Sequence, residues 1–439
     1  MKSNKRSSPA NIVFHLLVVA AMKNGQLVQA DSVTATNGAP IDLSKELEEA
    51  ASLNASPGAK KVNDWAASDP FVRTMTVLEH GKIVSSYVRD DVDPEVPWQA
   101  WSTTKSWVSL LTGVMLQDGS LSSLNETLGD IFPEEESWAE ATDTEFRKAV
   151  TVRELLTMSS GLVPEPWDLN NTEADMAEAL PGGDSGGGSL PDALAFPLIG
   201  EKGKFSYLGI SNIMSYVILE RTGMTPRQYL AENVLPDLGI DDSDINWWQN
   251  ADGVEYAYHG IELTPEQMAK FGQLYLAEGA TGPGKPSLLP AEWFKASTSA
   301  QLEFSVEIFP GFTMEASYGY LFWSGEGEKF FRNPNIGKNT VWCAFGAGGQ
   351  DICIDKQLGR VNVMQRDFDP TNMMANGLGA AVAMDPTLSF EVDDKVDEDD
   401  VGVKDSSGDT TSASACRRNI LYPFFSSTTL SLFAFLVGW

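Results

Sequence analysis

Hydrophobic and polar positions divide the chain into a strand-rich start, a helical middle and a strand-rich end. The stretch FVRTMTVLEHGKIVSSYVRD, residues 71–90, carries two β-branched runs on either side of His80-Gly81. A pair of this kind between two such runs is typical of a hairpin. We therefore predict a hairpin here with His80 in its turn, and further strands at 318–323, 350–355 and 360–366.

Apolar residues recur at helical spacing from Ser102 to about Gln117, and Asp118-Gly119 ends the pattern. The residues expected on the buried face of this helix are Trp107, Leu110, Leu111, Val114 and Met115. Further helices are predicted at 152–159, 213–223 and 264–279. An early hairpin, a helical middle and late strands predict an α+β domain whose antiparallel sheet joins both ends of the chain and is flanked by helices.

Both ends of the sequence resemble addressing signals. A basic start precedes the apolar run at 12–22, and VQA ends at Ala30, so residues 1–30 are predicted to be a secretory signal peptide, with a buried N-terminal helix as the alternative. The tail at 420–439 is apolar and uncharged, as in a signal for GPI-type anchoring, with a single membrane span as the alternative. We expect a secreted protein held at the cell surface.

Between these ends, composition predicts three segments. Residues 31–66 are rich in Ala, Ser, Asn and Gly and are expected to form a flexible extension, and 67–390 the folded domain. Residues 391–419 are acidic and Ser/Thr-rich and are expected to be a solvated linker. The sequons at Asn54, Asn125 and Asn170 are compatible with a glycoprotein.

Composition narrows the possible partners. The 439 residues are 42% hydrophobic and 21% charged, which suffices for a sizeable core. The 61 acidic against 31 basic residues give a formal charge of -30, which argues against nucleic acid or an anionic membrane surface as a partner. With three cysteines there is no disulfide scaffold, although Cys343 and Cys353 can pair in an oxidising compartment or remain thiols. No H-E-x-x-H, C-x-x-C or P-loop spacing occurs, so neither a metal nor a cofactor is expected.

The sequence AWSTTKSW, residues 100–107, places Ser102 three residues before Lys105. On a helix these two residues share a face, so the lysine can take the serine's proton, provided that the amine is neutral. Burial between Trp101 and Trp107, or cationic and hydrogen-bonding neighbours, would lower its pKa as required. The alternative is an ordinary turn of amphipathic helix, because S-x-x-K occurs by chance about once in a chain of this length.

The surrounding sequence favours the catalytic interpretation. STTKSWVSLLTGVMLQDGSLSSLNETLGDIFP, from residue 102, and VTVRELLTMSSGL, from residue 150, resemble the serine beta-lactamase and penicillin-binding superfamily. The resemblance covers roughly residues 70–385 and is greatest to class C-type esterases and 6-aminohexanoate-oligomer hydrolases. The stretches IELTPEQMAKFGQLYLAEG, LLPAEWF and YGYLFW resemble these families in the same order. The resemblance implies the beta-lactamase/transpeptidase-like fold with an inserted helical subdomain.

The resemblance implies two further catalytic elements. Tyr207 in KFSYLGISNIM matches a tyrosine that shares proton transfer with the lysine, as base for acylation and as acid for the leaving group. A nearby ammonium is expected to lower its pKa. The family often has Tyr-x-Asn here, whereas this chain has Tyr207-Leu208-Gly209. Asn212, one turn further on, is the candidate replacement for the asparagine that holds a substrate amide.

The third element is AFGAGGQ, residues 344–350, before an apolar strand. Beta-lactamases usually begin it with a lysine or histidine that grips the substrate carboxylate, which Ala344 cannot do. Gly346 and Gly348 would let the substrate approach an edge strand, and the N–H of Ala347 would join that of Ser102 in the oxyanion hole. A plain Gly-rich hairpin is the alternative.

Other candidates are weaker. GDSGG around Ser185 fits two serine-nucleophile motifs, but both need a histidine base, and no apolar strand precedes it. Trp167 and the pair Trp247-Trp248 are candidates for the wall of a substrate cleft, with surface packing as the alternative.

These observations predict a serine hydrolase that cleaves a small-molecule ester or amide through an acyl-enzyme on Ser102. The alternative is a non-catalytic surface binding protein that keeps the fold.

Overall fold

The computed structural model describes residues 41–139, 143–162, 189–195, 201–207, 212–309, 312–369 and 376–392. The predicted signal peptide, C-terminal tail and most of the acidic linker lie outside these residues, as do Asn170, Ser185 and Trp167. Within them, no helix is both long and apolar enough to cross a membrane.

An eight-stranded antiparallel sheet organises the described residues, with strand order β2-β1-β11-β10-β9-β8-β7-β6. A second sheet has the order β3-β5-β4. The strands are β1 (Val72–Glu79), β2 (Lys82–Val88), β3 (Trp98–Gln99), β4 (Asn246–Trp247), β5 (Ile261–Leu263), β6 (Leu302–Phe309), β7 (Phe312–Tyr318), β8 (Trp323–Gly325), β9 (Val341–Gly346), β10 (Gln350–Asp355) and β11 (Arg360–Arg366).

Because β1 pairs with β11, the sheet joins early and late parts of the chain, which confirms the predicted α+β architecture. The β1–β2 hairpin turns at His80-Gly81, where φ is +47° and +83°, as the sequence indicated. The predicted strands at 350–355 and 360–366 are β10 and β11.

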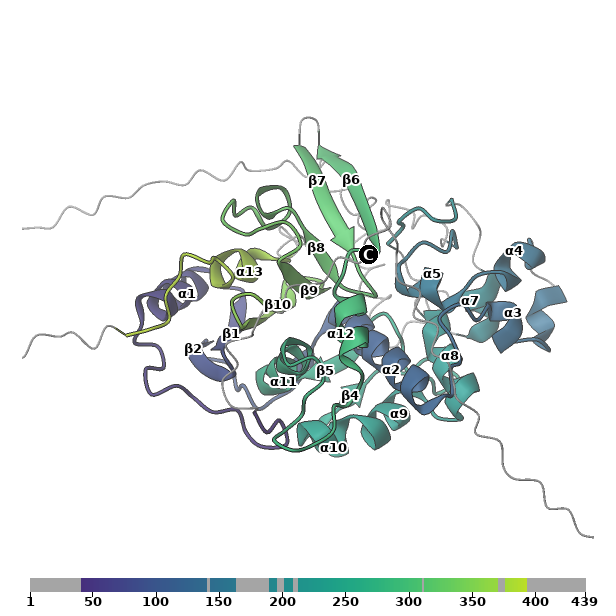
Figure 1. Ribbon diagram of the computed structural model, residues 1–439, viewed down its shortest axis with the longest axis horizontal. Helices are drawn as coiled ribbons and strands as arrows, with labels where there is room; N and C mark the ends of the chain where they lie inside the picture. The colour runs from purple at the N-terminus through teal and green to yellow at the C-terminus, as the bar shows by residue number, and fades with distance from the viewer. Residues whose placement is uncertain are drawn as a thin grey trace, which may run out of the picture. The chain divides into compact units, whose positions relative to one another are not determined.

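Helices cover both faces of the large sheet (Figure 1). They are α1 (Pro57–Ser68), α2 (Thr104–Asp118), α3 (Leu128–Ile131), α4 (Thr144–Lys148), α5 (Val152–Leu156), α7 (Leu190–Ala195), α8 (Asn212–Thr222), α9 (Pro226–Asn233), α10 (Leu235–Leu238), α11 (Pro265–Leu276), α12 (Ala291–Ser297) and α13 (Leu378–Ala383). Shorter helical turns are η1 (Trp101–Thr103), η2 (Glu136–Ala139), η3 (Asp242–Asp244) and η4 (Gly327–Phe331).

Two hydrophobic cores lie on opposite faces of the sheet. On one face α1 and α13 pack against Met75 and Val77 of β1 and Met364 of β11. On the other, α11 packs against β10 and β11, and Gly272 allows the close approach, since a Cβ there would meet Val361 at 2.5 Å. The sheet is therefore the middle layer of three.

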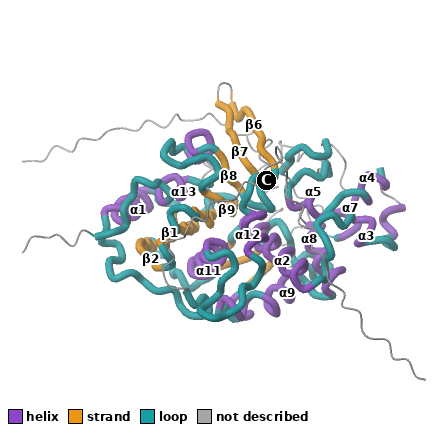
Figure 2. Tube along the Cα trace, in the orientation of Figure 1, coloured by secondary structure: helices purple, strands orange, loops and turns teal. Residues whose placement is uncertain are grey.

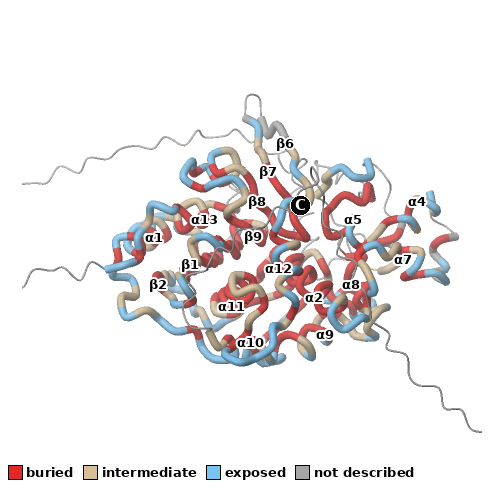
Figure 3. Tube along the Cα trace, in the orientation of Figure 1, coloured by how far each residue is buried: buried red, intermediate tan, exposed pale blue. Residues whose placement is uncertain are grey.

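The helical subdomain lies between β3 and β4 in sequence and contains α2 to α10 (Figure 2). The helices predicted at 152–159, 213–223 and 264–279 correspond to α5, α8 and α11. α2 ends at Gly119, whose φ of +83° fits a left-handed helix end. It is buried on all sides from Thr104 to Met115, and not only on the predicted face (Figure 3).

Two predictions about the fold were wrong. Within the stretch expected to be flexible, residues 41–66 are folded: Leu43 is fully buried, and most of α1, capped by the Ser56 hydroxyl, lies here. The strand predicted at 318–323 is broken, because residues 319–322 form a turn between β7 and β8 in which Leu321 has a φ of +62°. Apolar content alone did not distinguish a buried turn from a strand.

Candidate active site

Ser102 lies in η1, the single turn that leads into α2. The residue before it, Trp101, has a φ of +50°, which is strained for a bulky side chain. The N–H of Trp101 donates to Oε1 of Gln99 at 3.0 Å and its carbonyl accepts from the Thr104 hydroxyl at 2.6 Å, so the strained residue is held on both sides. The serine is thus presented at the start of a buried helix.

Lys105 contacts Ser102 directly, as the i, i+3 spacing predicted. Its Nζ lies 2.9 Å from the Ser102 Oγ and 2.8 Å from the carbonyl oxygen of Tyr258. The side chain is only 5% exposed, and burial lowers its pKa to about 7. A substantial fraction of this amine is therefore neutral near pH 7 and can accept a proton.

The surroundings of Lys105 differ from those predicted. The rings beside its Nζ are Tyr207, at 5.0 Å from the ring centroid, and Tyr258, at 5.8 Å. Trp107, expected to flank the lysine, stacks on Phe271 at 4.5 Å. Burial is the cause of the low pKa.

Tyr207 completes a triangle with the serine and the lysine. Its ring packs against that of Trp323 at 5.1 Å, and its hydroxyl interacts with the side chains of Ser102 and Trp323. The expectation of a lowered pKa was wrong: burial raises the pKa of Tyr207 to about 12, and the interactions with Ser102 and Trp323 only partly oppose this. At neutral pH the phenol is protonated and can donate a proton.

Histidine does not take this role among the described residues. His80 lies in the β1–β2 turn, and His259 stacks on Tyr256 at 4.9 Å. Burial, and then the nearby charge of Lys105, lowers the pKa of His259 to about 3, so its ring is neutral.

The third predicted element is the hairpin that joins β9 to β10. Gly348 and Gly349 have φ of +75° and +96°, values that favour glycine, so residues 347–349 form its turn. Gly346 lies against the segment before Ser102, because a Cβ here would meet the Ala100 carbonyl oxygen at 2.3 Å. Among the described residues, no hydrogen bond uses the N–H of Ser102 or of Ala347. Both are available to an oxyanion.

The surroundings of this hairpin differ from the prediction in three respects. β9 is not an edge strand, since it lies between β8 and β10, although β8 pairs with it only at Cys343. At Gly346 the lack of a side chain allows the backbone of Ala100 to approach closely. Gly348 lies instead beside Phe368, whose ring would be 3.4 Å from a Cβ at this glycine.

Asn212, predicted to hold a substrate amide, is 1% exposed at the start of α8. Its Oδ1 accepts from the N–H of Ala257 at 3.3 Å, next to the residue whose carbonyl binds Lys105. Asn212 therefore supports the lysine's surroundings and does not face substrate. Trp247 and Trp248 donate to Tyr256 and Glu262, which agrees with a packing role.

Sequence reasoning missed Tyr258 and Phe368. Tyr258 acts through its backbone carbonyl, which no motif identifies. Phe368 is 37% exposed and its ring lies 6.4 Å from that of Trp101. Phe368 thus offers a partly exposed apolar ring next to Trp101 and the glycine turn.

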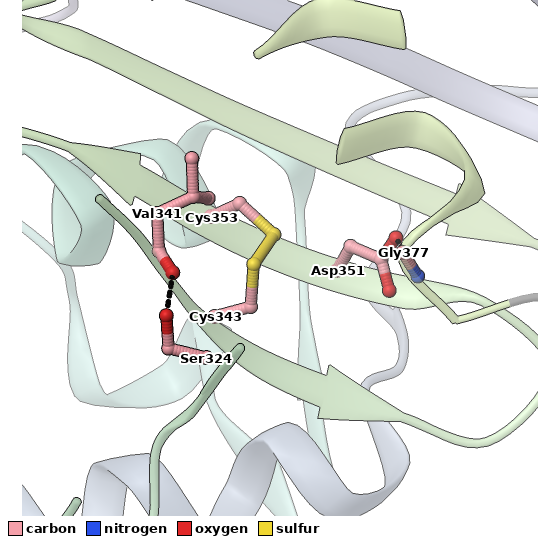
Figure 4. Close-up of a disulfide and its surroundings, with 6 residues drawn as sticks. All are labelled: Ser324, Val341, Cys343, Asp351, Cys353 and Gly377. Atoms are coloured by element: carbon pink, nitrogen blue, oxygen red, sulfur yellow. Dashed lines mark hydrogen bonds between the residues drawn. A yellow bond between two sulfur atoms is a disulfide. The ribbon is translucent and has the colours of Figure 1, made fainter. Parts of the chain in front are cut away.

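The disulfide between Cys343 and Cys353 joins residues that face each other on β9 and β10, with Cα atoms 4.1 Å apart (Figure 4). Pairing was one of the two possibilities that the sequence left open. Both cysteines are fully buried, so the bond fixes the base of the hairpin whose turn carries Ala347.

The chain matches the family model described as beta-lactamase over residues 73–373. A comparison with curated protein sequences finds no match. A protein from Bacillus anthracis described as a candidate 6-aminohexanoate-dimer hydrolase is similar in structure, with TM-score 0.55, 18% identity, and coverage of 75% of this chain and 84% of that one.

Two further solved structures are similar. A penicillin-binding protein homologue from Caulobacter crescentus has TM-score 0.55 at 17% identity, with 79% of this chain and 97% of that chain covered. EstCE1, a hydrolase with promiscuous acyltransferase activity, has TM-score 0.56 at 14% identity, covering 74% and 97%. These likenesses establish the fold.

Proposed function

The chain belongs to the beta-lactamase family, and from this premise we propose that it is a serine hydrolase that cleaves esters or amides through an acyl-enzyme on Ser102. The observation that carries the proposal is the 2.9 Å contact between Ser102 Oγ and a buried lysine whose pKa is about 7. Burying an amine has an energetic cost, and such perturbed groups concentrate at functional sites.

In the first step Ser102 Oγ attacks the carbonyl carbon, and its proton passes to the neutral Nζ of Lys105. The carbonyl oxygen becomes an oxyanion between the N–H groups of Ser102 and Ala347. The bond from the carbonyl carbon to the leaving oxygen or nitrogen then breaks. The leaving atom takes a proton from Tyr207, which recovers one from Lys105, and water later hydrolyses the ester on Ser102 by the reverse transfers.

The pKa values support these roles. Lys105 is the base in the first step because it alone of the pair has a substantial neutral, proton-accepting fraction near pH 7. Tyr207, with a pKa of about 12, is protonated and acts as the acid. This assignment differs from the one that the family resemblance implied, in which Tyr207 is the base for acylation.

The residues around the serine support a proposal for the substrate class. Ala344 offers no charge to a carboxylate, and the chain's formal charge of -30 disfavours the approach of anions. Trp101, which precedes the serine, and Phe368 place two aromatic rings 6.4 Å apart beside Ser102. These features support a neutral ester or amide with an apolar group and do not support lactam antibiotics that carry a carboxylate.

A fluorophosphonate probe with mass spectrometry tests the proposal. We expect the probe on the peptide that contains Ser102, loss of labelling and of ester turnover in Ser102→Ala, and retention of both in the control Ser185→Ala. Labelling unchanged in Ser102→Ala, or a wild-type protein that neither reacts nor turns over esters, amides or lactams, would contradict it and favour the non-catalytic binding protein.

We also propose that the protein is secreted and held at the cell surface by its C-terminal tail. The Cys343–Cys353 disulfide supports this, because such bonds persist in oxidising compartments. Release of the native protein from intact cells by a phosphatidylinositol-specific phospholipase would identify a GPI-type anchor. Retention after this treatment would contradict that form of anchoring.

A further inference from the structure

The turn at 347–349 carries the N–H of Ala347, which the proposed mechanism requires to point in a fixed direction. The sequence of the turn, however, favours backbone mobility. Two of its three residues are glycines with positive φ, and glycine adopts many backbone conformations. An oxyanion hole is effective only when its donors are oriented in advance. The side chains that surround this turn therefore bear directly on the chemistry at Ser102.

Arg366, the last residue of β11, binds the turn through its guanidinium group. It is 1% exposed, and its guanidinium donates to the Gly348 carbonyl at 2.9 Å and to the carboxylate of Asp69 at 2.7 Å. A charge-assisted hydrogen bond of this kind is stronger than a neutral one. It fixes the peptide group that follows Gly348.

Gln350 fixes the preceding peptide group. Its side-chain amide accepts from the backbone N–H of Arg366 at 3.1 Å and donates to the backbone carbonyl of the same residue at 2.8 Å. The same amide nitrogen lies 3.4 Å from the carbonyl of Ala347. The last residue of the AFGAGGQ motif thus links the turn to β11.

Asn376 holds the other end of the turn. Its Oδ1 accepts from the N–H of Gly349 at 3.1 Å, and this N–H also donates to the Gly346 carbonyl at 3.2 Å. In a trans peptide the N–H points away from the C=O, so fixing the Gly346 carbonyl also directs the N–H of Ala347. Asn376 is itself anchored, because the next residue, Gly377, donates its N–H to Asp351 at 3.0 Å (Figure 4).

We propose that Arg366, Gln350 and Asn376 are positioning residues that hold the 347–349 turn so that the N–H of Ala347 faces the oxyanion. This inference rests on the proposed function. Together the three side chains bind two carbonyls and one N–H of the turn and leave the N–H of Ala347 to the substrate.

Asn376 is the best position for a test. It is half-buried, so that its replacement should disturb the fold little, whereas removal of Arg366 would leave Asp69 without its ion-pair partner. Asn376→Leu removes the acceptor at similar size, and Asn376→Asp keeps an acceptor oxygen. Asn335→Leu is the matched control, because Asn335 bonds Asp385 at the far end of α13.

With a chromogenic ester, we expect kcat of Asn376→Leu to fall about tenfold with little change in KM, because a loosened oxyanion donor weakens the transition state alone. Asn376→Asp and Asn335→Leu should stay within about threefold of wild type. The affinity for phenylboronic acid, whose tetrahedral adduct occupies the oxyanion site, should fall in Asn376→Leu by the same factor as kcat.

Wild-type kcat in Asn376→Leu overturns the positioning role while leaving the proposed function intact. Equal losses in Asn376→Leu and Asn376→Asp, accompanied by equal drops in melting temperature, also overturn it and indicate a structural role. If the wild-type protein shows neither fluorophosphonate labelling nor turnover, both proposals fail.

Discussion

Replacing Lys105 by methionine should make the protein less active and more stable. Methionine has nearly the length of lysine but no charge, so Lys105→Met keeps the packing between Tyr207 and Tyr258 and removes the buried amine. A general base contributes about 10²- to 10⁴-fold to the rate, and we expect kcat for an ester to fall within that range.

The stability gain follows from the pKa. Burial lowers the pKa of Lys105 from 10.5 to about 7. At about 1.4 kcal/mol for each factor of ten in proton affinity, keeping this side chain buried costs about 4 to 5 kcal/mol at neutral pH. Leaving the Tyr258 carbonyl without its donor costs about 1 to 3 kcal/mol. The difference predicts that Lys105→Met is more stable than wild type by about 2 kcal/mol at pH 7.

The gain should depend on pH in a defined direction. Between pH 7 and pH 10.5 the unfolded wild-type chain carries a proton on Lys105 that the folded protein has released. Wild-type stability therefore rises with pH in this window relative to the variant, whose methionine does not titrate. The stability difference should change by about 3 kcal/mol between pH 7 and pH 10, so that Lys105→Met, more stable at pH 7, becomes less stable than wild type by about 1 kcal/mol at pH 10.

Urea unfolding of both proteins at pH 7, 8.5 and 10 measures this difference. The control is Lys270→Met, because Lys270 is equally buried but paired with Glu266 at 3.2 Å. This variant should gain no stability. A Lys105→Met protein that is less stable than wild type at pH 7, or whose difference from wild type is independent of pH, would refute the reasoning.

Four more predictions concern the site and its support. The kcat/KM for an ester should rise tenfold per pH unit up to about pH 7, where Lys105 loses its proton, and then stay level to pH 10, because Tyr207 titrates only at about 12; a maximum below pH 6 would exclude Lys105 as the base. Tyr207→Phe should lower kcat about 10²- to 10⁴-fold with an unchanged circular dichroism spectrum. Phe368→Ala should raise KM for a phenyl ester several-fold more than KM for an acetate ester of a small alcohol. Equal changes in the two KM values would show that Phe368 does not contact the substrate. Replacing Cys343 and Cys353 together by alanine should cost about 2 to 3 kcal/mol in urea unfolding, from the entropy of the ten-residue loop that the bond closes; no measurable loss would mean that β9 and β10 hold each other without it.

The sequence predicted those strands and turns that are determined by the order of apolar, polar and turn-forming residues within one short segment. The β1–β2 hairpin was predicted because His80-Gly81 separates two β-branched runs. The strands β10 and β11 were predicted with their bounds because short runs rich in apolar or β-branched residues lie at their centres, at 352–354 and 361–364. The fold of residues 41–66 was not predictable in this way. α1 has few large apolar residues, and it is stable because Ala59, Val62 and Ala66 pack against the sheet.

The same division holds at the site. Spacing along one helix predicted the contact between Ser102 and Lys105, since i and i+3 meet wherever the helix forms. Nothing local placed Tyr258 beside the lysine, because its contribution is a backbone carbonyl from a segment 153 residues away. Asn212 was misassigned for the same reason: its position one turn beyond Tyr207 suggested a substrate contact, but tertiary packing directs its side chain toward Ala257.

One physical cause accounts for both proton-transfer groups. Burial penalises whichever form is charged, so it lowers the pKa of an amine and raises that of a phenol. The pKa of Lys105 moves to about 7 and that of Tyr207 to about 12. Near pH 7 the uncharged form of each is available, and in that form the amine has a lone pair to accept a proton and the phenol has a proton to give. A single apolar enclosure therefore provides a base and an acid beside Ser102, and it does so without a carboxylate or an imidazole in direct contact with the serine among the described residues.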